Sequence, residues 1–177
     1  MQVIFPFTQT TDLRSIRERL AIHFGKIRVE DRPNPVGQLV GSFIGRRTYD
    51  WKSWDAFARL EERCQNWDAV ADVEATLDGV IRPKKKTSEL RQALRAICTC
   101  FGQINLDFLA RYDVDLAMNC LRQIDGVGPK IAAATLNFNV LRKRTFVVDT
   151  HVLRLLRRLG FMGMSWMRII SLSSIGK

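Results

Sequence analysis

The stretch LRQIDGVGPKIAAA, residues 121–134, decides the expected fold of this chain. It has the pattern of a helix end, then a turn with glycine at 126 and 128, then a second helix that starts at once. Glycine lets a backbone adopt positive φ and lets a ligand approach closely. Backbone amides at the start of a helix, together with the helix dipole, favour a bound anion. The stretch therefore predicts two helices joined by a turn that can hold a phosphate, although a plain connector fits the Gly-x-Gly pattern alone about equally well.

Helical signals continue on both sides of this stretch. Apolar residues recur at helical spacing from Leu13 to Phe24, where Gly25 can end the helix, and Asn34 before Pro35 is typical of a helix start. Further helices are expected to begin at Ser53 (with Trp54, Phe57 and Leu60 facing inward), at Thr87 and at Asp115, and to span residues 130–140 and 150–159. Strand-like alternation is almost absent, so the expected fold class is all-α.

The charge of the chain points to a polyanionic partner. The 177 residues carry a formal net charge of +10 and 46% of them are hydrophobic, which predicts a globular and strongly basic protein. Nucleic acid is the first candidate for such a chain. Lys84, Lys85 and Lys86 form the one dense basic run. They are either phosphate contacts or a solvated loop before a helix.

Other classes of protein fit the sequence less well. No apolar run approaches the roughly 18 residues that a membrane-spanning helix needs, and no secretory signal opens the chain. The four cysteines, Cys64, Cys98, Cys100 and Cys120, are irregularly spaced and form no CxxC pair. They are interpreted as ordinary thiols, and we expect a cytoplasmic protein.

A second motif follows the turn. Nineteen residues after Lys130 comes Asp149, within the segment FVVDTHV of residues 146–152. Taken alone, a lysine at a helix start is a solvated side chain and an aspartate before a helix is an N-cap. In combination with the glycine turn, the two motifs resemble the helix-hairpin-helix DNA glycosylases of the endonuclease III superfamily. The resemblance extends from about residue 34 to residue 160, and residues 121–160 are its specific part.

The resemblance implies a site and a reaction. Lys130 matches the catalytic lysine and Asp149 the catalytic aspartate, while Gly126, Val127 and Gly128 match the hairpin that binds a DNA phosphate. Relatives that only remove a base lack this lysine, so Lys130 indicates the bifunctional branch, which also cleaves the strand. A lysine amine that attacks C1′ displaces the base and forms an imine. A carboxylate can stabilise the positive charge that develops on the sugar.

The resemblance also implies an architecture of two helical lobes with the site in the cleft between them. One lobe is a six-helix bundle, here residues 34–145, with the helix-hairpin-helix at about 115–140. The other lobe combines residues 1–33 and 146–177. Since the segment after Gly160 is apolar without helical periodicity, we expect this second lobe to be incomplete. The expected partner is double-stranded DNA with a damaged, oxidised base or an abasic site, bound by a monomer.

The sequence departs from the family pattern in two places. Many relatives carry a glutamine that fills the gap left by the extruded nucleotide, and Arg47 takes that position here. Many relatives also end in four cysteines that hold a [4Fe–4S] cluster, but no cysteine follows Cys120, so no metal and no cluster are expected in this chain. A non-catalytic helix-hairpin-helix DNA-binding module remains the alternative, whereas Lys130 disfavours a glycosylase without lyase activity.

Overall fold

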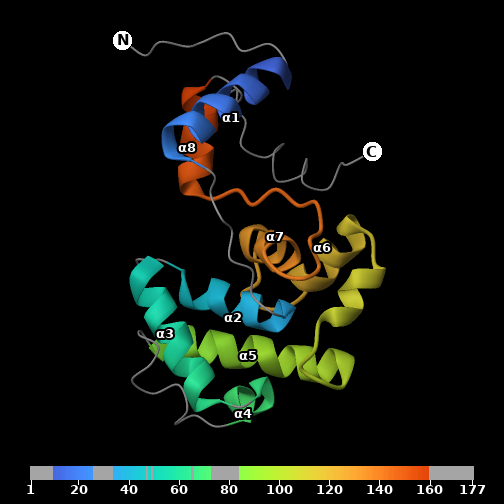
Figure 1. The fold of residues 1–177 in the computed structure, drawn as a ribbon. Coiled ribbons are helices and arrows are strands. Elements are labelled where there is room, and N and C mark those ends of the chain that lie inside the picture. The colour runs from blue at the N-terminus through green and yellow to red at the C-terminus, as the bar shows by residue number, and fades with distance from the viewer. Residues whose placement is uncertain are drawn as a thin grey trace. The chain divides into compact units, whose positions relative to one another are not determined.

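The computed structural model describes residues 10–25, 34–46, 48, 50–64, 66–72 and 84–159, which are helical with connecting loops (Figure 1). The helices are α1 (Thr10–Phe24), α2 (Pro35–Ile44), α3 (Asp50–Arg63), α4 (Trp67–Asp72), α5 (Lys84–Phe101), the 3-10 helix η2 (Asp107–Arg111), α6 (Val114–Arg122), α7 (Pro129–Asn137) and α8 (Thr150–Arg158). These residues contain no strand, which confirms the expected all-α class. None of their helices is long and apolar enough to cross a membrane.

The chain divides into two compact units. Unit 1 combines residues 1–30 with residues 148–172, and unit 2 combines residues 31–147 with residues 173–177. Among the described residues, α1 and α8 belong to unit 1 and the helices from α2 to α7 belong to unit 2. The glycine turn at residues 125–128 therefore lies in unit 2.

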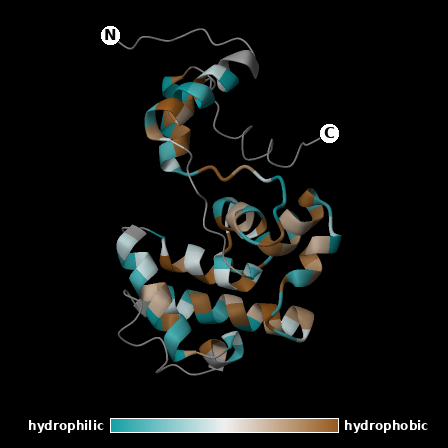
Figure 2. Cartoon of the chain, in the orientation of Figure 1, coloured by the Kyte–Doolittle hydropathy of each residue, from teal (hydrophilic) through white to brown (hydrophobic). Residues whose placement is uncertain are grey.

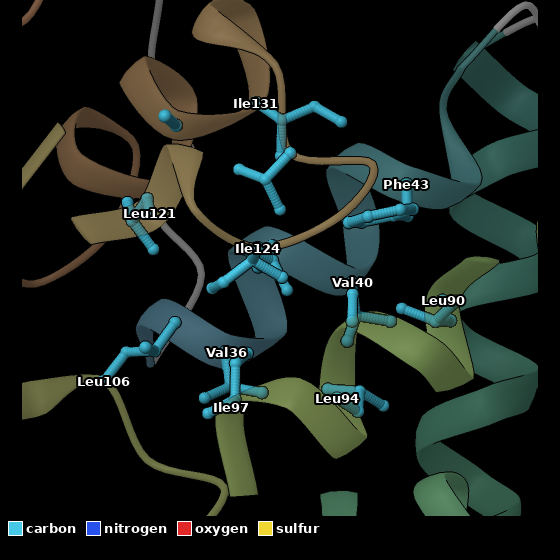
Figure 3. Packing of buried hydrophobic residues seen from close by; sticks show 14 of the residues in the cluster. Val36, Val40, Phe43, Leu90, Leu94, Ile97, Leu106, Leu121, Ile124 and Ile131 are labelled. Carbon is cyan, nitrogen blue, oxygen red and sulfur yellow. The ribbon is translucent and has the colours of Figure 1, made fainter. Parts of the chain in front are cut away.

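The core of unit 2 is built around α2. This helix has no charged residue and contacts α3, α5 and α7. Leu39, Val40 and Phe43 are almost completely buried, and each such side chain stabilises the fold by about 1.5–3 kcal/mol. Figure 3 shows α2 side chains converging with Leu90 and Leu94 of α5 and with others of the cluster. Hydrophobic and hydrophilic residues alternate along α5 in Figure 2, as expected of a helix with one buried face.

The sequence signals for one helix start and one helix end are confirmed. The Asn34 side chain accepts a hydrogen bond from the Gly37 amide at 2.6 Å, so Asn34 caps α2 and Pro35 is its first residue. Gly25 follows α1 with a φ of +74°, the left-handed conformation that favours glycine after a helix.

Other expected helix starts were wrong by a few residues. The N-cap residue of α6 is Asp113, whose carboxylate accepts a hydrogen bond from the Leu116 amide at 2.7 Å. The expected start at Asp115 therefore falls inside the helix. The third helix begins at Asp50 and not at Ser53. The fifth begins at Lys84 and not at Thr87, because lysine is a good helix former and the basic run continues the helix backwards.

One apolar residue that was expected to face inward, Trp54, is exposed, and so are other large apolar side chains. In α3 the buried stripe consists of Ala56, Phe57 and Leu60, whereas Trp54 is 47% exposed. In α1 Phe24 is 67% exposed, and in α8 the buried residue is Leu153. Helical spacing identifies a helix, but the stripe that is buried depends on which neighbours the helix meets. The segment after Gly160, expected to belong to an incomplete lobe, lies outside the described residues.

Candidate functional site

The turn between α6 and α7 is short and closed by backbone hydrogen bonds. The Ile124 amide donates to the Leu121 carbonyl at 3.2 Å, and the Val127 amide donates to the Ile124 carbonyl at 3.0 Å. Ile124 and Val127 are each only 4% exposed, so both side chains anchor the turn in the core of unit 2. Gly126 and Gly128 are exposed, and this pattern places the glycine backbone on the surface above a buried apolar support.

Gly126 is required by the turn itself. Its φ is +82°, in the left-handed region that other residues adopt only at a cost. A Cβ at this position would lie 3.1 Å from Cε1 and 3.2 Å from Cζ of Phe43, which is 1% exposed and cannot move freely. Both the backbone conformation and the close approach of Phe43 therefore call for glycine at 126.

Gly128 differs from Gly126. It has a φ of −81° and a ψ of 176°, which any residue can adopt, and a Cβ would meet nothing within 4 Å. A positive φ was expected at one or both of these glycines. Only Gly126 adopts a positive φ. Gly128 is the N-cap residue of α7, and the space around it is open to a ligand.

The two glycines should respond differently to alanine. Gly126→Ala should reduce the free energy of unfolding by about 2 kcal/mol, since it combines left-handed strain with a contact to the Phe43 ring. Gly128→Ala should change it by less than about 0.5 kcal/mol. Denaturant unfolding followed by circular dichroism measures both, and equal stabilities of the two variants would contradict this account of the turn.

Lys130 is the second residue of α7, directly after Pro129, and its side chain is exposed. The helix behind it is firmly seated, because Ala132, Ala133 and Ala134 are buried and α7 contacts both α2 and α6. Small side chains allow this close helix packing. The backbone of Lys130 is therefore fixed, while its side chain is exposed.

One polar contact links the turn to α5, and a second links the chain after α2 to α5. Arg46, at the end of α2, forms an ion pair with Glu89 at 2.6 Å, and Asp125 accepts from the Gln92 side chain at 3.3 Å. Glu89 and Gln92 are three residues apart and so lie on one face of α5. Sequence reasoning did not find these contacts, because each joins residues more than thirty positions apart.

Within the basic run of residues 84–86, Lys86 has a structural role and forms hydrogen bonds inside the protein. Lys86 donates to the Ile44 carbonyl at 3.2 Å and to the Thr48 hydroxyl at 2.5 Å, so it neutralises the C-terminal end of α2. Burial lowers the pKa of Lys86, and the nearby charge of Arg46 lowers that pKa further. Lys85 is exposed. The side chain of Lys84, and Arg47 altogether, lie outside the described residues.

The chain that follows α7 is tied back onto that helix. The Asn137 side chain donates to the carbonyls of Lys143 (3.1 Å) and Thr145 (2.8 Å). The Thr145 hydroxyl donates to the Ala133 carbonyl at 2.8 Å, and the Lys143 amide donates to the Leu136 carbonyl at 2.9 Å. We call residues 143–145 the strap. Buried Thr145 was not identified from the sequence, in which the stretch has no periodic signal.

Asp149 begins α8 in unit 1. Its Oδ1 accepts hydrogen bonds from the amides of His151 (2.9 Å) and Val152 (2.8 Å), so it is the N-cap of that helix. The expectation that Asp149 can cap the helix is confirmed. Amides at a helix N-terminus stabilise a negative charge, and capping holds the carboxylate in one place.

Metal-binding clusters are absent from the part of the chain that the structure describes, where no group of three or more His, Cys, Asp or Glu side chains could hold an ion. The cysteines are free thiols, with Cys98 and Cys100 exposed.

Comparison with known proteins relates this helical chain to DNA repair proteins. It is 31% identical over 129 residues to an Arabidopsis thaliana protein named "Putative DNA glycosylase", an alignment that covers 70% of this chain and 43% of the relative. It is 25% identical over 136 residues to an endonuclease III of Sulfolobus acidocaldarius, with 75% and 59% covered. No family model matches the chain.

The two similarities support a relationship to DNA glycosylases of the endonuclease III kind. The chain spans about half the length of the curated relatives it matches, 43% of one and 59% of the other.

Proposed function

We propose that this chain is a DNA base-excision repair glycosylase with apurinic/apyrimidinic lyase activity, acting through an imine on Lys130. The observation that carries the proposal is the anchored glycine turn with Lys130 exposed on the first turn of the helix behind it. The similarity to proteins named DNA glycosylase and endonuclease III supports the same reaction class. The proposed substrate is double-stranded DNA that contains an oxidised base or an abasic site.

The turn suits a phosphate of the DNA backbone. The first amides of α7 have no partner within the helix by its geometry, and the helix dipole adds a partial positive charge. Because Gly128 has no side chain and open space around it, a phosphate can approach these amides. In this proposal Gly126, Val127 and Gly128 hold the strand next to the nucleotide that reacts, while Lys85 and the other exposed cations contribute longer-range attraction.

The proposed chemistry uses Lys130 and Asp149. The neutral lysine amine attacks C1′ of the flipped nucleotide, the bond from C1′ to the base breaks, and the base leaves with its electron pair. The amine loses two protons, one to the departing base and one to the ring oxygen O4′ as the sugar ring opens, which gives the imine. A proton then leaves C2′, the bond from C3′ to the phosphate oxygen breaks, and the strand is cut. The Asp149 carboxylate stabilises the positive charge that develops on the sugar.

A nicking assay on abasic DNA tests the proposal against the alternative of a non-catalytic DNA-binding module. The wild-type protein should cut a duplex at a single abasic site and leave the undamaged duplex intact. Gly128→Ala should remain folded yet cut more slowly at limiting protein, because its Cβ stands where the phosphate approaches. A wild-type protein that binds the abasic duplex tightly but never cuts it would favour the binding module.

The remaining expectations are part of the same proposal. We propose a cytoplasmic monomer that needs neither a metal ion nor an iron–sulfur cluster in this chain for the lyase step. An imine mechanism is consistent with this, since the covalent bond to lysine provides the activation that a metal would otherwise supply. We expect the protein to keep full lyase activity after prolonged dialysis against a chelator. We also expect it to elute from gel filtration at the mass of one chain.

A further inference from the structure

Arg46 lies beside the glycine turn although it is eighty positions away in sequence. Its Nη1 is 3.8 Å from the position that a Cβ on Gly126 would take, and its guanidinium lies over the Phe43 ring at 5.4 Å. The same Phe43 ring packs against Gly126. Arg46 is therefore the charged neighbour of the turn on its α2 side, and its side chain is still 36% exposed.

Glu89 holds Arg46 in this place. The 2.6 Å contact is an ion pair between partly exposed side chains, 36% and 26% accessible, and such pairs contribute little to stability. Its position matters more than its strength. A carboxylate this close to an anion-binding turn disfavours a phosphate there unless a cation offsets it. A guanidinium has five donors in a fork that matches carboxylate and phosphate equally well.

We propose that Arg46 is a DNA phosphate ligand that acts together with the glycine turn, and that Glu89 competes with the DNA for it. In the free protein Arg46 pairs with Glu89. In the complex its guanidinium turns to a phosphate next to the one at the turn, and Glu89 becomes solvated at the cost of some affinity. Glu89 thus limits how tightly the protein holds DNA. The inference rests on the proposed function, since it requires that the turn binds DNA.

A second ion pair provides a matched control. Arg59 and Asp55 form a pair at 2.5 Å within α3, and the Arg59 side chain also contacts the Asp55 carbonyl at 3.4 Å. Like Arg46 and Glu89, this pair is one arginine and one acidic residue in unit 2. Its contacts stay within one helix, and it is more exposed, at 49% and 58%. Substitutions in either pair change the net charge of the protein by the same amount.

The experiment measures binding of a duplex with a stable abasic-site analogue over about 50 to 200 mM salt. Glu89→Gln should bind several-fold more tightly than wild type, whereas Asp55→Asn should bind nearly as wild type does. Arg46→Ala should bind about tenfold more weakly, with a slope of log K against log salt that is smaller by about one. Arg59→Ala should leave that slope unchanged. Glu89→Gln preserves shape, so it tests the proposal even if Arg46→Ala unfolds.

The outcomes distinguish a failure of the proposed role of Arg46 from a failure of the proposed function. If Glu89→Gln and Asp55→Asn raise affinity equally, the effect is that of net charge alone and Arg46 is not a phosphate ligand. If wild type binds with a steep salt dependence and these pairs behave alike, this inference fails while the proposed function stands. If wild type does not bind the duplex at all, the proposed function fails and the role of Arg46 fails with it.

Discussion

Borohydride should trap the wild-type protein on duplex DNA that contains an abasic site, and Lys130→Ala should abolish the trapped product. Reduction converts an imine between the amine and C1′ into a stable secondary amine, so the adduct survives denaturing electrophoresis. Alanine at 130 offers no nucleophile, and we expect strand cutting to fall by on the order of a thousandfold or more. The substitution should not unfold the protein, because the Lys130 side chain is exposed and alanine is a good helix former.

Lys52→Ala is the control for this experiment. Lys52 is also an exposed lysine of unit 2, on α3, where it lies over the Trp51 ring at 5.1 Å. Its removal lowers the net charge by the same amount and should leave the yield of adduct near that of wild type. Unchanged trapping in Lys130→Ala would show that another amine is the nucleophile, and the central assignment would be wrong.

Asp149→Asn should slow base release by on the order of a hundredfold to a thousandfold while DNA binding changes little. In the proposed mechanism, the substitution removes the negative charge that stabilises the transition state. It should preserve α8, because asparagine is as good an N-cap as aspartate and can accept the same hydrogen bonds from the His151 and Val152 amides. Single-turnover rates of base release, measured beside equilibrium binding, separate a transition-state role from a binding role.

The cap of α6 offers a matched control for Asp149. Asp113 is likewise an aspartate N-cap, with its carboxylate accepting from the Leu116 amide. Asp113→Asn makes the same chemical change at a helix start and should release the base at the wild-type rate. A similar loss of rate in both variants would indicate a general effect of capping, and a normal rate in Asp149→Asn would remove Asp149 from the mechanism.

The features that the sequence predicted correctly are those encoded within a few residues. Asn34 and Pro35 start a helix, Gly25 ends one, and the stretch of residues 121–134 forms two helices around a turn. Each signal depends on local hydrogen bonds and local backbone conformation. Residues 67–72 and 107–111 escaped notice because helices of five or six residues are too short to show periodicity.

The features that could not be predicted from the sequence depend on contacts between residues that are far apart in the chain. That Gly126 has no room for a side chain while Gly128 has open space follows from how Phe43 of α2 packs on the turn. That Arg46 pairs with Glu89 and Lys86 with the end of α2 follows from the packing of α2 on α5. The exposure of Trp54 has the same origin, since the neighbours of α3 decide which side of it is buried.

The strap that ties residues 143–145 to α7 also bears on the order in which the protein folds. Its contacts with α7 join residues six to twelve positions apart, as in the bonds of Asn137 to Lys143 and of Thr145 to Ala133. Closing such short loops costs little chain entropy, whereas the contacts of α2 with α7 must close a loop of about ninety residues. The segment that carries Lys130 can therefore form early as a local nucleus, onto which α2 docks later.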